Sequence, residues 1–419
     1  MSKSLKKGLV PHLRFPEFKS AKSWEVSCID EVAQTFSGGT PATGRKEYYG
    51  GDIPFIRSAE INSKNTELFL TEEGLKNSSA KMVEVGDVLY ALYGANSGDV
   101  AISKINGAIN QAILCIKAKN KNKHIYQFLS HRKEAILSRY LQGGQGNLSG
   151  EIVKSIQIPL PSEEKELLKV SDCLSSLDDL LTAQGEKVEA LKTYKKGLLQ
   201  QLFPQEGETV PHLRFPEFKN DGDWEILQLS TISERITEKV GHQKLTTVSI
   251  TAGTGFVSQV EKFSRDISGK QYQNYIVLKK GEFSYNKGNS KKFPQGCIYK
   301  LIEFEKVAAP NAFISFRLKE GFVADFYQAY FENNYHGKQL KKFITSGARS
   351  DGLLNINADD FFNITFPTPK NINEQIKIAE FIGSFNSRIE QEAKILKNLK
   401  LHKKGLLQEL FPNIEEWGK

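Results

Sequence analysis

Two stretches of the chain place apolar residues alternately three and four positions apart. The first begins near Leu167, the second near Ile378, and each ends at a Phe-Pro pair, at 203–204 and 411–412. Apolar residues at this spacing form one stripe along an α-helix, as in the seam of a coiled coil. The pattern predicts two long helices with the seam residues Val170, Leu174, Leu177, Leu181, Val188, Leu191, Ile378, Ile382, Phe385, Ile389, Leu396 and Leu399.

The ends of both helices carry capping and breaking residues. Ser162 is a suitable N-cap, and Asn371 with Glu374 resembles a capping box. Gly197 and Gly405 are expected to break the helices one or two turns before the Phe-Pro pairs. Because a long apolar stripe is not left exposed to water, we expect the two helices to pair within the chain. Homodimerisation through the same seam is the alternative.

The regions outside these helices predict an α+β fold. Each contains one amphipathic helix, at about 123–141 and 323–345, followed by a loop rich in Gly and Ser. Runs of apolar and β-branched residues predict strands at Ile53–Arg57, Asp87–Tyr93, Val100–Ser103, Ala112–Ala118, Thr246–Thr251, Glu282–Tyr285, Gly296–Leu301 and Ala312–Leu318.

The chain is an internal duplication of a unit of roughly 200 residues. VPHLRFPEF occurs at 10–18 and again at 210–218, and KKGLLQQLFP at 195–204 returns as KKGLLQELFP at 403–412. Between these repeated segments, the interiors share only short patches. Drift after duplication would explain the divergence, but we favour the interpretation that each interior binds a different ligand on a common frame.

Composition narrows the functional class. The chain has 419 residues with 39% hydrophobic and 25% charged residues, which is typical of a folded protein. No apolar run reaches the roughly 18 residues that a membrane span needs. The four cysteines are scattered, which favours a cytoplasmic location without structural zinc. The net charge of +8 lies mainly in the two large blocks and permits nucleic-acid binding.

The LRFPEF segments, the stretch GGTPATGRKEYYGGDIPFIRSAEI at 38–61 and the KKGLLQxLFP endings resemble specificity subunits of type I restriction-modification systems. The resemblance implies double-stranded DNA as ligand, with each of two target-recognition domains reading half of a bipartite target. It also implies two adenine-N6 methyltransferase (modification) subunits docked on the two helices, and endonuclease/translocase subunits. Those partners would use S-adenosylmethionine, ATP and Mg, while this chain would bind no cofactor.

The expected architecture is therefore α+β, with two globular domains separated by two long antiparallel coiled-coil helices and a pseudo-two-fold relation between the repeats. We expect target-recognition domains at 1–161 and 205–370. The spacer helices would cover 162–204 and 371–412, and residues 413–419 would form a tail.

Catalytic motifs are missing from the sequence. It contains no Pro-Pro turn of the kind that holds a flipped adenine, and the P-loop-like stretch from Gly39 to Arg45 lacks the lysine. No carboxylates are suitably clustered for a magnesium-dependent nuclease. We therefore expect no catalytic residue and no metal ligand in this chain.

Candidate DNA contacts lie in glycine-flanked turns, where Lys and Arg reach phosphates and Asn reads adenine edges. In the first interior these residues are Thr40, Thr43, Arg45, Lys46, Tyr48, Arg57, Tyr93, Asn96 and Ser97. The second interior has EKVGHQKLTT at 238–247 in place of the GGTP loop, so its contacts cannot be copied from the first. Its candidates are Lys244, Tyr285, Asn286, Lys287, Asn289, Lys291, Lys292, Arg349 and Ser350.

The preferred function is a non-catalytic DNA-specificity subunit that reads an asymmetric bipartite target and positions enzyme subunits. A stand-alone DNA-binding regulator with similar bipartite readout is the first alternative. It accounts poorly for two helices of about 40 residues with a duplicated surface. A pure assembly scaffold, without DNA sequence preference, is the second.

Overall fold

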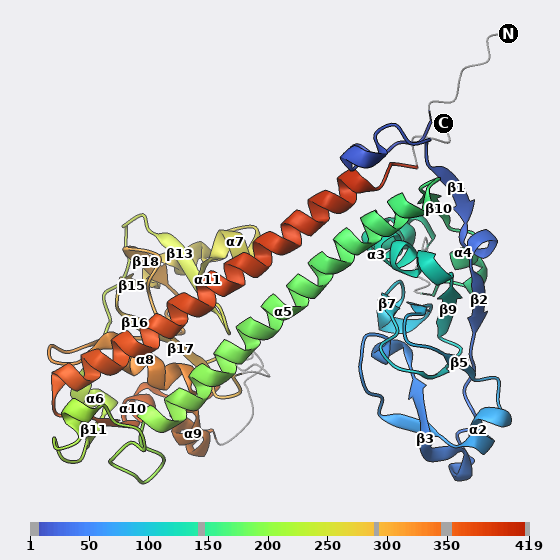
Figure 1. The fold of residues 1–419 in the computed structure, drawn as a ribbon. Coiled ribbons are helices and arrows are strands. Elements are labelled where there is room, and N and C mark those ends of the chain that lie inside the picture. Colours follow the sequence, from blue (N-terminus) through green and yellow to red (C-terminus); the bar gives the residue numbers. More distant parts are fainter. Residues whose placement is uncertain (1–7, 141–146, 289–292, 345–353, 415–419) are drawn as a thin grey trace. The chain divides into compact units, whose positions relative to one another are not determined.

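The computed structural model describes residues 8–140, 147–288, 293–344 and 354–414 (Figure 1). These residues form two compact units. The first unit combines residues 1–185 with 394–419, and the second covers 186–393. Each contains strands and helices, so the α+β class predicted from the sequence is confirmed.

The first unit contains two four-stranded sheets, in the orders β2-β9-β6-β7 and β4-β3-β8-β5, and the antiparallel pair β1-β10. Its helices are α1 (Ile29–Val32), α2 (Glu72–Lys76), α3 (Asn122–Tyr140) and α4 (Gly150–Lys154). Its strands are β1 (Glu25–Cys28), β2 (Gln34–Ser37), β3 (Tyr49–Ile56), β4 (Leu68–Leu70), β5 (Lys81–Val83), β6 (Val88–Ala91), β7 (Val100–Ile102), β8 (Gly107–Ile109), β9 (Ile113–Lys117) and β10 (Gln157–Leu160).

The second unit repeats this topology with different residues. Its sheets follow the orders β12-β19-β16-β17 and β14-β13-β18-β15, with the pair β11-β20. Its strands are β11 (Glu225–Gln228), β12 (Ser233–Arg235), β13 (Thr246–Thr251), β14 (Gly255–Ser258), β15 (Ile276–Lys279), β16 (Phe283–Asn286), β17 (Cys297–Lys300), β18 (Lys306–Ala309), β19 (Ile314–Leu318) and β20 (Thr365–Thr368). All the predicted strands are therefore present, with ends shifted by a few residues.

The helices of the second unit correct one prediction. They are α6 (Leu229–Ile232), α7 (Gln259–Phe263), α8 (Ala324–Glu332), α9 (Tyr335–Leu340) and α10 (Ala358–Phe362). The single helix expected at 323–345 is two helices, because Asn334 adopts a left-handed conformation with φ of 55°. In the first unit, α3 is continuous as predicted.

Both long helices are continuous, with α5 covering Glu164–Leu202 and α11 covering Ile372–Leu410. The predicted breaks at Gly197 and Gly405 are wrong, because both glycines lie within the helices. Leucines that follow these glycines pack into the domain cores. That packing outweighs the cost of about 1 kcal/mol for a glycine inside a helix.

The caps of the long helices also differ from the prediction. Asn371 caps α11, with its side-chain oxygen accepting a hydrogen bond from the N–H of Asn373 at 3.0 Å. The capping box is incomplete because the carboxylate of Glu374 binds Arg214 instead. The hydroxyl of Ser162 donates to the carbonyl of Lys22 at 3.5 Å, and α5 begins with Glu164.

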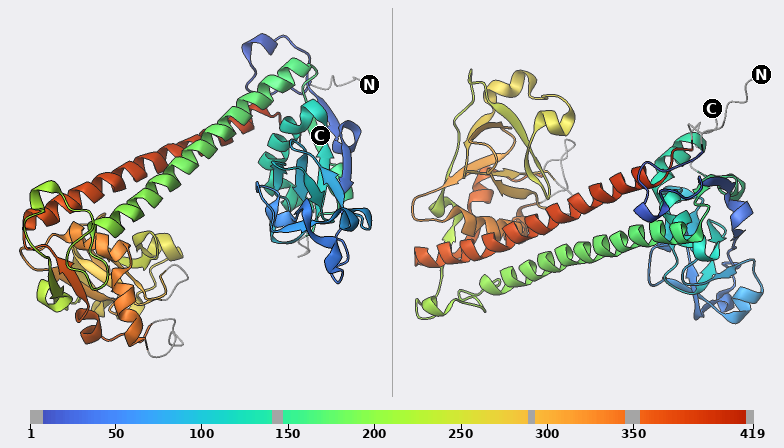
Figure 2. Two further views of the ribbon diagram at one scale, coloured as in Figure 1. Left: turned by 60° about the horizontal axis from the view of Figure 1, so that its bottom comes forward. Right: turned by 45° about the horizontal axis from the view of Figure 1, so that its top comes forward.

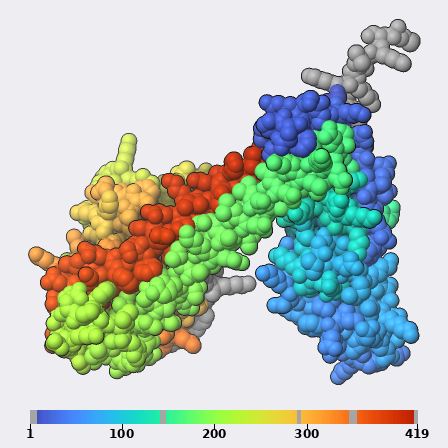
Figure 3. Space-filling view, in the orientation of Figure 1, coloured from blue at the N-terminus to red at the C-terminus, as the bar shows by residue number. Residues whose placement is uncertain are grey.

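Within each unit, the segments of α5 and α11 that belong to it lie side by side (Figures 1, 2 and 3). In the first unit Lys403 forms an ion pair with Asp178, and in the second Lys187 pairs with Glu392 at 2.7 Å. The two helices therefore pair within the chain, and homodimerisation is not needed to cover the seam.

The outer parts of the predicted seam do more than join the helices. Val170 and Leu174 belong to the core of the first unit, and Ile378 and Ile382 to that of the second. Val188 is buried, whereas the other seam residues are half-buried: Leu177, Leu181, Leu191, Phe385, Ile389, Leu396 and Leu399. Each long helix is thus anchored by its beginning in a globular core.

The ends of the two helices enter the cores of the opposite repeats. Phe411, at the end of α11, packs in the first unit with its ring 6.3 Å from Trp24 and nearly perpendicular to it. Phe203, at the end of α5, packs in the second unit at the same distance from Trp224. The core of the first repeat is therefore completed by the KKGLLQxLFP segment that ends the second repeat, and the core of the second repeat by the segment that ends the first.

A buried ion pair explains why the LRFPEF segment and the tryptophan recur. In the first unit, Arg14 donates two hydrogen bonds of 2.6 Å to Glu166 in the first turn of α5, and Trp24 donates to the same carboxylate. Arg214 and Glu374 repeat the arrangement at 2.8 Å in the second unit, with Trp224 again as donor. The repeated residues thus fasten the start of each long helix to its domain.

Candidate nucleic-acid interface

The predicted contact loops of the first unit leave from one end of one sheet. Ser37, the last residue of β2, pairs with Leu114 near the start of β9. Ala91, the last residue of β6, pairs with Ile113 at the start of β9. Because these strands are antiparallel neighbours, the loops that follow β2 and β6 and the loop that precedes β9 meet at the same edge.

Hydrogen bonds tie these loops together. The hydroxyl of Thr40 donates to the side-chain oxygen of Gln111 at 2.6 Å. The N–H of Gly94 points to the side-chain oxygen of Asn147 at 3.4 Å. Both amide side chains belong to exposed residues that were not predicted from the sequence, since no local motif marks them. Only the sheet topology brings them beside the predicted loops.

Several predicted residues of the first unit are accessible. Thr43, Arg45 and Lys46 are exposed in the loop that follows β2. Arg45 has only a weak ion pair of 3.4 Å with Glu47, and 62% of its side chain is exposed. Tyr93, which is 38% exposed, begins the next loop, where Asn96 is half-buried. These side chains can reach a ligand at the sheet edge.

Other predicted residues of the first unit have structural roles. Tyr48 is buried, with the guanidinium of Arg45 over its ring at 5.8 Å. Arg57 is held by the carboxylates of Glu60 and Glu67, at 3.0 and 2.5 Å. Those two acids neutralise its charge. Ser97 is nearly buried, and its hydroxyl donates to the carbonyl of Leu92 at 3.0 Å, so it shapes the turn. The prediction that these three contact DNA is not supported by their surroundings.

The second unit repeats the gathering of loops at one sheet edge. Arg235 at the end of β12 pairs with Phe316, and Tyr285 near the end of β16 pairs with Ile314 at the start of β19. The loops after β12 and β16 and the loop before β19 therefore share an edge. Lys244 is exposed in the first of these loops.

Residues around the β16 turn correct the prediction for the second unit. Tyr285 is fully buried, stacks on Phe361 and donates its hydroxyl to the carbonyl of Gln295 at 2.7 Å, so a DNA contact by Tyr285 is wrong. Asn286 donates to the carbonyl of Ile250 at 3.3 Å. Lys287 donates to a backbone carbonyl at 3.2 Å, so both shape the turn. The remaining candidates lie outside the described residues: Asn289, Lys291, Lys292, Arg349 and Ser350.

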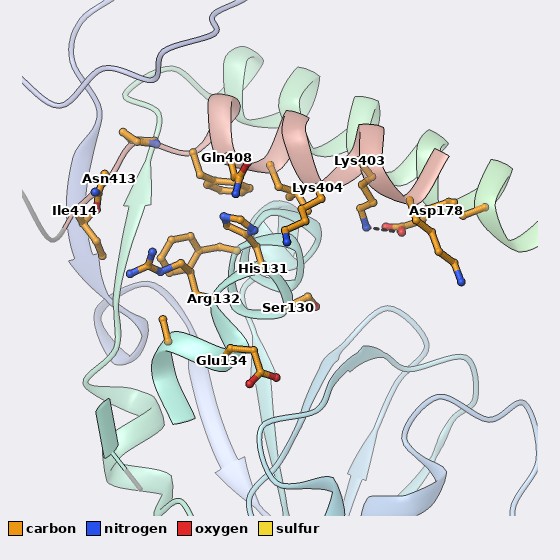
Figure 4. A pocket seen from close by; sticks show the side chains of 17 residues that line it. Ser130, His131, Arg132, Glu134, Asp178, Lys403, Lys404, Gln408, Asn413 and Ile414 are labelled. Carbon is orange, nitrogen blue, oxygen red and sulfur yellow. Dashed lines mark hydrogen bonds and ion pairs between the residues drawn. The ribbon is translucent and has the colours of Figure 1, made fainter. Parts of the chain in front are cut away.

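A groove of about 720 Å³ lies in the first unit between α3 and the end of α11 (Figure 4). Arg132 and His131 of α3 and Lys404 of α11 line it, together with the ion pair of Lys403 and Asp178. Burial, Arg132 and Lys404 lower the pKa of His131. The basic residues on the α11 side come from the repeated frame, so this groove is separate from the diverged loops.

Two other kinds of feature are absent from the described part of the chain. Among those residues, no group of three His, Cys, Asp or Glu side chains is arranged to hold a metal ion. Within the same ranges, no helix is both long and apolar enough to cross a membrane.

Comparison with known sequences points to one family. Residues 21–202 match the family model described as "Type I restriction modification DNA specificity domain". The type I restriction enzyme MjaIX specificity subunit of Methanocaldococcus jannaschii is 29% identical over 216 residues, covering 48% of this chain and 47% of that protein. The HindI specificity subunit of Haemophilus influenzae is 26% identical over 156 residues, covering 34% of this chain and 33% of that protein. The chain thus spans about half the length of the first relative and less of the second.

Solved structures extend the likeness to nearly the whole chain. The crystal structure of a type I S subunit from M. genitalium has a TM-score of 0.61 at 16% identity, covering 97% of this chain and 100% of that one. This match shows a shared fold. Residues 21–202 of this chain are therefore similar to the type I restriction-modification DNA specificity domain, and the chain has the fold of a type I S subunit along nearly all of its length.

Proposed function

We propose that this chain is the DNA-specificity subunit of a type I restriction-modification complex and reads an asymmetric bipartite target. The observation that carries the proposal is the repeated sheet edge. Each unit presents loops from equivalent strands on an equivalent frame, but the residues in those loops differ. Two frames of one kind with two different loop sets suit the reading of two different half-sites.

The chain supplies recognition, and the chemistry resides in partner subunits. Modification subunits would transfer methyl groups from S-adenosylmethionine to adenine N6, and endonuclease/translocase subunits would use ATP and Mg. Support comes from the absence of the relevant sequence motifs and from the family match. Incubating the purified chain with S-adenosylmethionine and duplex DNA should give no methylation, and methylation by the chain alone would contradict the proposal.

Two copies of the modification subunit would bind, one to each repeat. Val10 and Leu13 are 49% and 44% exposed, and Val210 and Leu213 are 43% and 42% exposed. In each pair, the second residue hydrogen-bonds to the end of a long helix, Leu13 to Glu409 and Leu213 to Gln201. Core packing does not require exposed apolar residues to stay identical in two diverged halves. A partner that binds the same surface on both halves does require them to stay identical.

The decisive experiment exchanges the second interior. Residues 226–362 would be replaced by the corresponding interior of another specificity subunit, and methylated adenines mapped in a genome that carries the complex. We expect one half of the target to change while the other half and the gap stay the same. Exchanging 26–155 is the matched control and should alter only the other half. A change in both halves after either exchange would contradict independent reading.

Partner docking has its own test. Val210→Glu with Leu213→Glu should remove one modification subunit from the assembled complex, because the exposed apolar pair would carry two charges. Native mass measurement of the complex reports the number of subunits bound. Val260→Glu is the control, since Val260 is 55% exposed but lies in the diverged interior. If the frame variant kept both subunits, the docking surface would lie elsewhere, and a stand-alone regulator would gain support if no subunit bound the wild type.

A further inference from the structure

A small cleft lies at the sheet edge where the loops of the second unit gather. It has a volume of about 240 Å³ and lies between the segment that follows β12 and the loop that precedes β19. Its lining consists of Arg235, Ile236, Thr237, Lys239, Asn274, Ile276, Asn311, Phe313 and Ser315. Cofactor and drug pockets occupy roughly 300–1,000 Å³, so a cleft of this size suits a small group.

The backbone around the cleft is held on both sides. The N–H of Ile236 donates to the carbonyl of Ser315 at 2.9 Å, and the N–H of Val240 donates to the carbonyl of Tyr275 at 2.8 Å. Along this segment Arg235, Thr237 and Lys239 occupy alternate positions, and all three line the cleft. The neighbouring acids Glu234 and Glu238 do not line the cleft.

The polar groups of the cleft have few partners of their own. Within residues 8–140, 147–288, 293–344 and 354–414, neither Arg235 nor Lys239 forms an ion pair, and the side chain of Asn311 forms no hydrogen bond. Arg235 and Lys239 are exposed. Two uncompensated cations beside an amide make a site for an anion that accepts several hydrogen bonds.

The first unit fills the equivalent place. A repeat offset of 200 aligns Gly39 with Lys239 and Gln111 with Asn311. A Cβ on Gly39 would lie 2.0 Å from the hydroxyl oxygen of Ser79, so no side chain fits there. Gln111 is bonded to Thr40, whereas the residue that aligns with Thr40 is Val240, which has no hydroxyl to offer. The cleft is therefore a feature of the second unit.

We propose that this cleft binds one phosphate group of the DNA backbone, through Arg235 and Lys239 as cations and Asn311 as an amide donor. The inference rests on the proposed DNA-recognition function and assigns part of it to named residues. A backbone phosphate fits because it is small, anionic and rich in acceptors, and because the cleft opens at the edge where the contact loops gather. The contact would anchor the second domain on DNA without reading sequence.

The test uses the full chain and a fluorescein-labelled duplex of mixed sequence, with affinity measured by anisotropy between about 50 and 200 mM salt. Each neutralised phosphate contributes about 0.9 to the slope of log affinity against log salt. We expect the Arg235→Gln/Lys239→Gln double variant to lower the slope by about that amount and, at 0.1 M salt, to weaken binding about eightfold. Each single variant should lower the slope by less. Arg235→Lys, which keeps the cation, should retain most of the slope.

Lys219→Gln is the control because it removes one exposed positive charge of the second unit outside the cleft. Its slope should match the wild type. If the wild type binds the duplex but the Arg235→Gln/Lys239→Gln double variant has the same slope as the wild type, the phosphate site is overturned and the proposed function is not. The phosphate site is also overturned if Lys219→Gln loses as much slope as the cleft variants. If the wild type does not bind the duplex at any salt concentration, the phosphate site and the proposed function both fail.

Discussion

The two units agree closely where the chain joins its long helices and differ where their loops gather. The ion pair of Arg14 with Glu166 recurs as Arg214 with Glu374, at 2.6 and 2.8 Å. At the sheet edge, by contrast, Gly39 is pressed against Ser79, while its counterpart Lys239 lines an open cleft. The residues that hold the frame together are thus the same in both units, whereas those at the sheet edge differ.

The largest expected change in stability comes from the helix ends that pack in the core of the opposite repeat. Phe411→Ala should destabilise the first unit and Phe203→Ala the second, each by about 3–5 kcal/mol, because a buried phenylalanine leaves a cavity. Hydrogen exchange resolved by peptide would locate the loss of protection. For Phe411→Ala we expect it in residues 8–140, which belong to the opposite repeat.

The control for this prediction is Leu401→Ala, because Leu401 is 59% exposed on α11. It should change the free energy of unfolding by less than about 0.5 kcal/mol. Loss of protection in the second unit after Phe411→Ala would show that each helix end supports its own repeat instead.

A moderate effect concerns two buried histidines, one in each unit. Burial lowers the pKa of His124 to about 4, and burial likewise lowers the pKa of His336 to about 4. The ordinary value is 6.5, so the unfolded chain binds these protons between pH 6.5 and 4 and the folded chain does not. The free energy of unfolding should therefore fall as the pH drops through this window, by at most about 3 kcal/mol for each histidine.

Acid unfolding of single variants would sharpen the comparison. His124→Gln should make the first unit less sensitive to acid and leave the second unchanged, and His336→Gln should do the reverse. Hydrogen exchange resolved by peptide, followed as the pH is lowered, reports the two units separately, since His124 and His336 lie in different units. His402→Gln, at an exposed position of α11, is the control. Equal acid sensitivity in all three variants would contradict the assignment to the buried rings.

Much of the architecture could be predicted from patterns that repeat along the chain. The seam spacing located both long helices, and the two copies of LRFPEF and KKGLLQxLFP marked the frame. The sequence could not show which core receives Phe203 and which receives Phe411, because the two segments are nearly identical and their placement depends on tertiary packing. Asn334 separates the two helices that replace the predicted one, because asparagine adopts the left-handed conformation more readily than most residues.

The candidate site was harder to predict because exposure depends on strand register. Tyr285 lies in a run of polar and basic residues that reads as a surface turn, but its position on β16 turns the ring into the core. An arginine is a common phosphate-binding residue, but the guanidinium of Arg57 forms ion pairs with Glu60 and Glu67. Conversely, the sequence predicts Lys244 as a DNA contact but not Lys239 of the same loop, because no local pattern distinguishes a lysine in a cleft from one in solvent.

The smallest expected effect tests whether the two long helices are equally continuous. Gly197 and Gly405 lie inside α5 and α11, and a Cβ added at either glycine meets nothing within 4 Å. Alanine at either position should therefore raise the free energy of unfolding by about 0.5–1 kcal/mol, because it restricts the unfolded chain more than glycine does. Gly86 and Gly281, which precede β6 and β16 with φ of 98° and 87°, are the controls. Alanine there should lower stability by about 1–2 kcal/mol, because a side chain strains a left-handed backbone. Denaturant unfolding of the four variants measures all of these differences.

If Gly197→Ala and Gly405→Ala destabilised the chain as the controls do, the helices would break at these glycines. The Phe-Pro segments would then reach the opposite cores as separate turns instead of as continuations of α5 and α11.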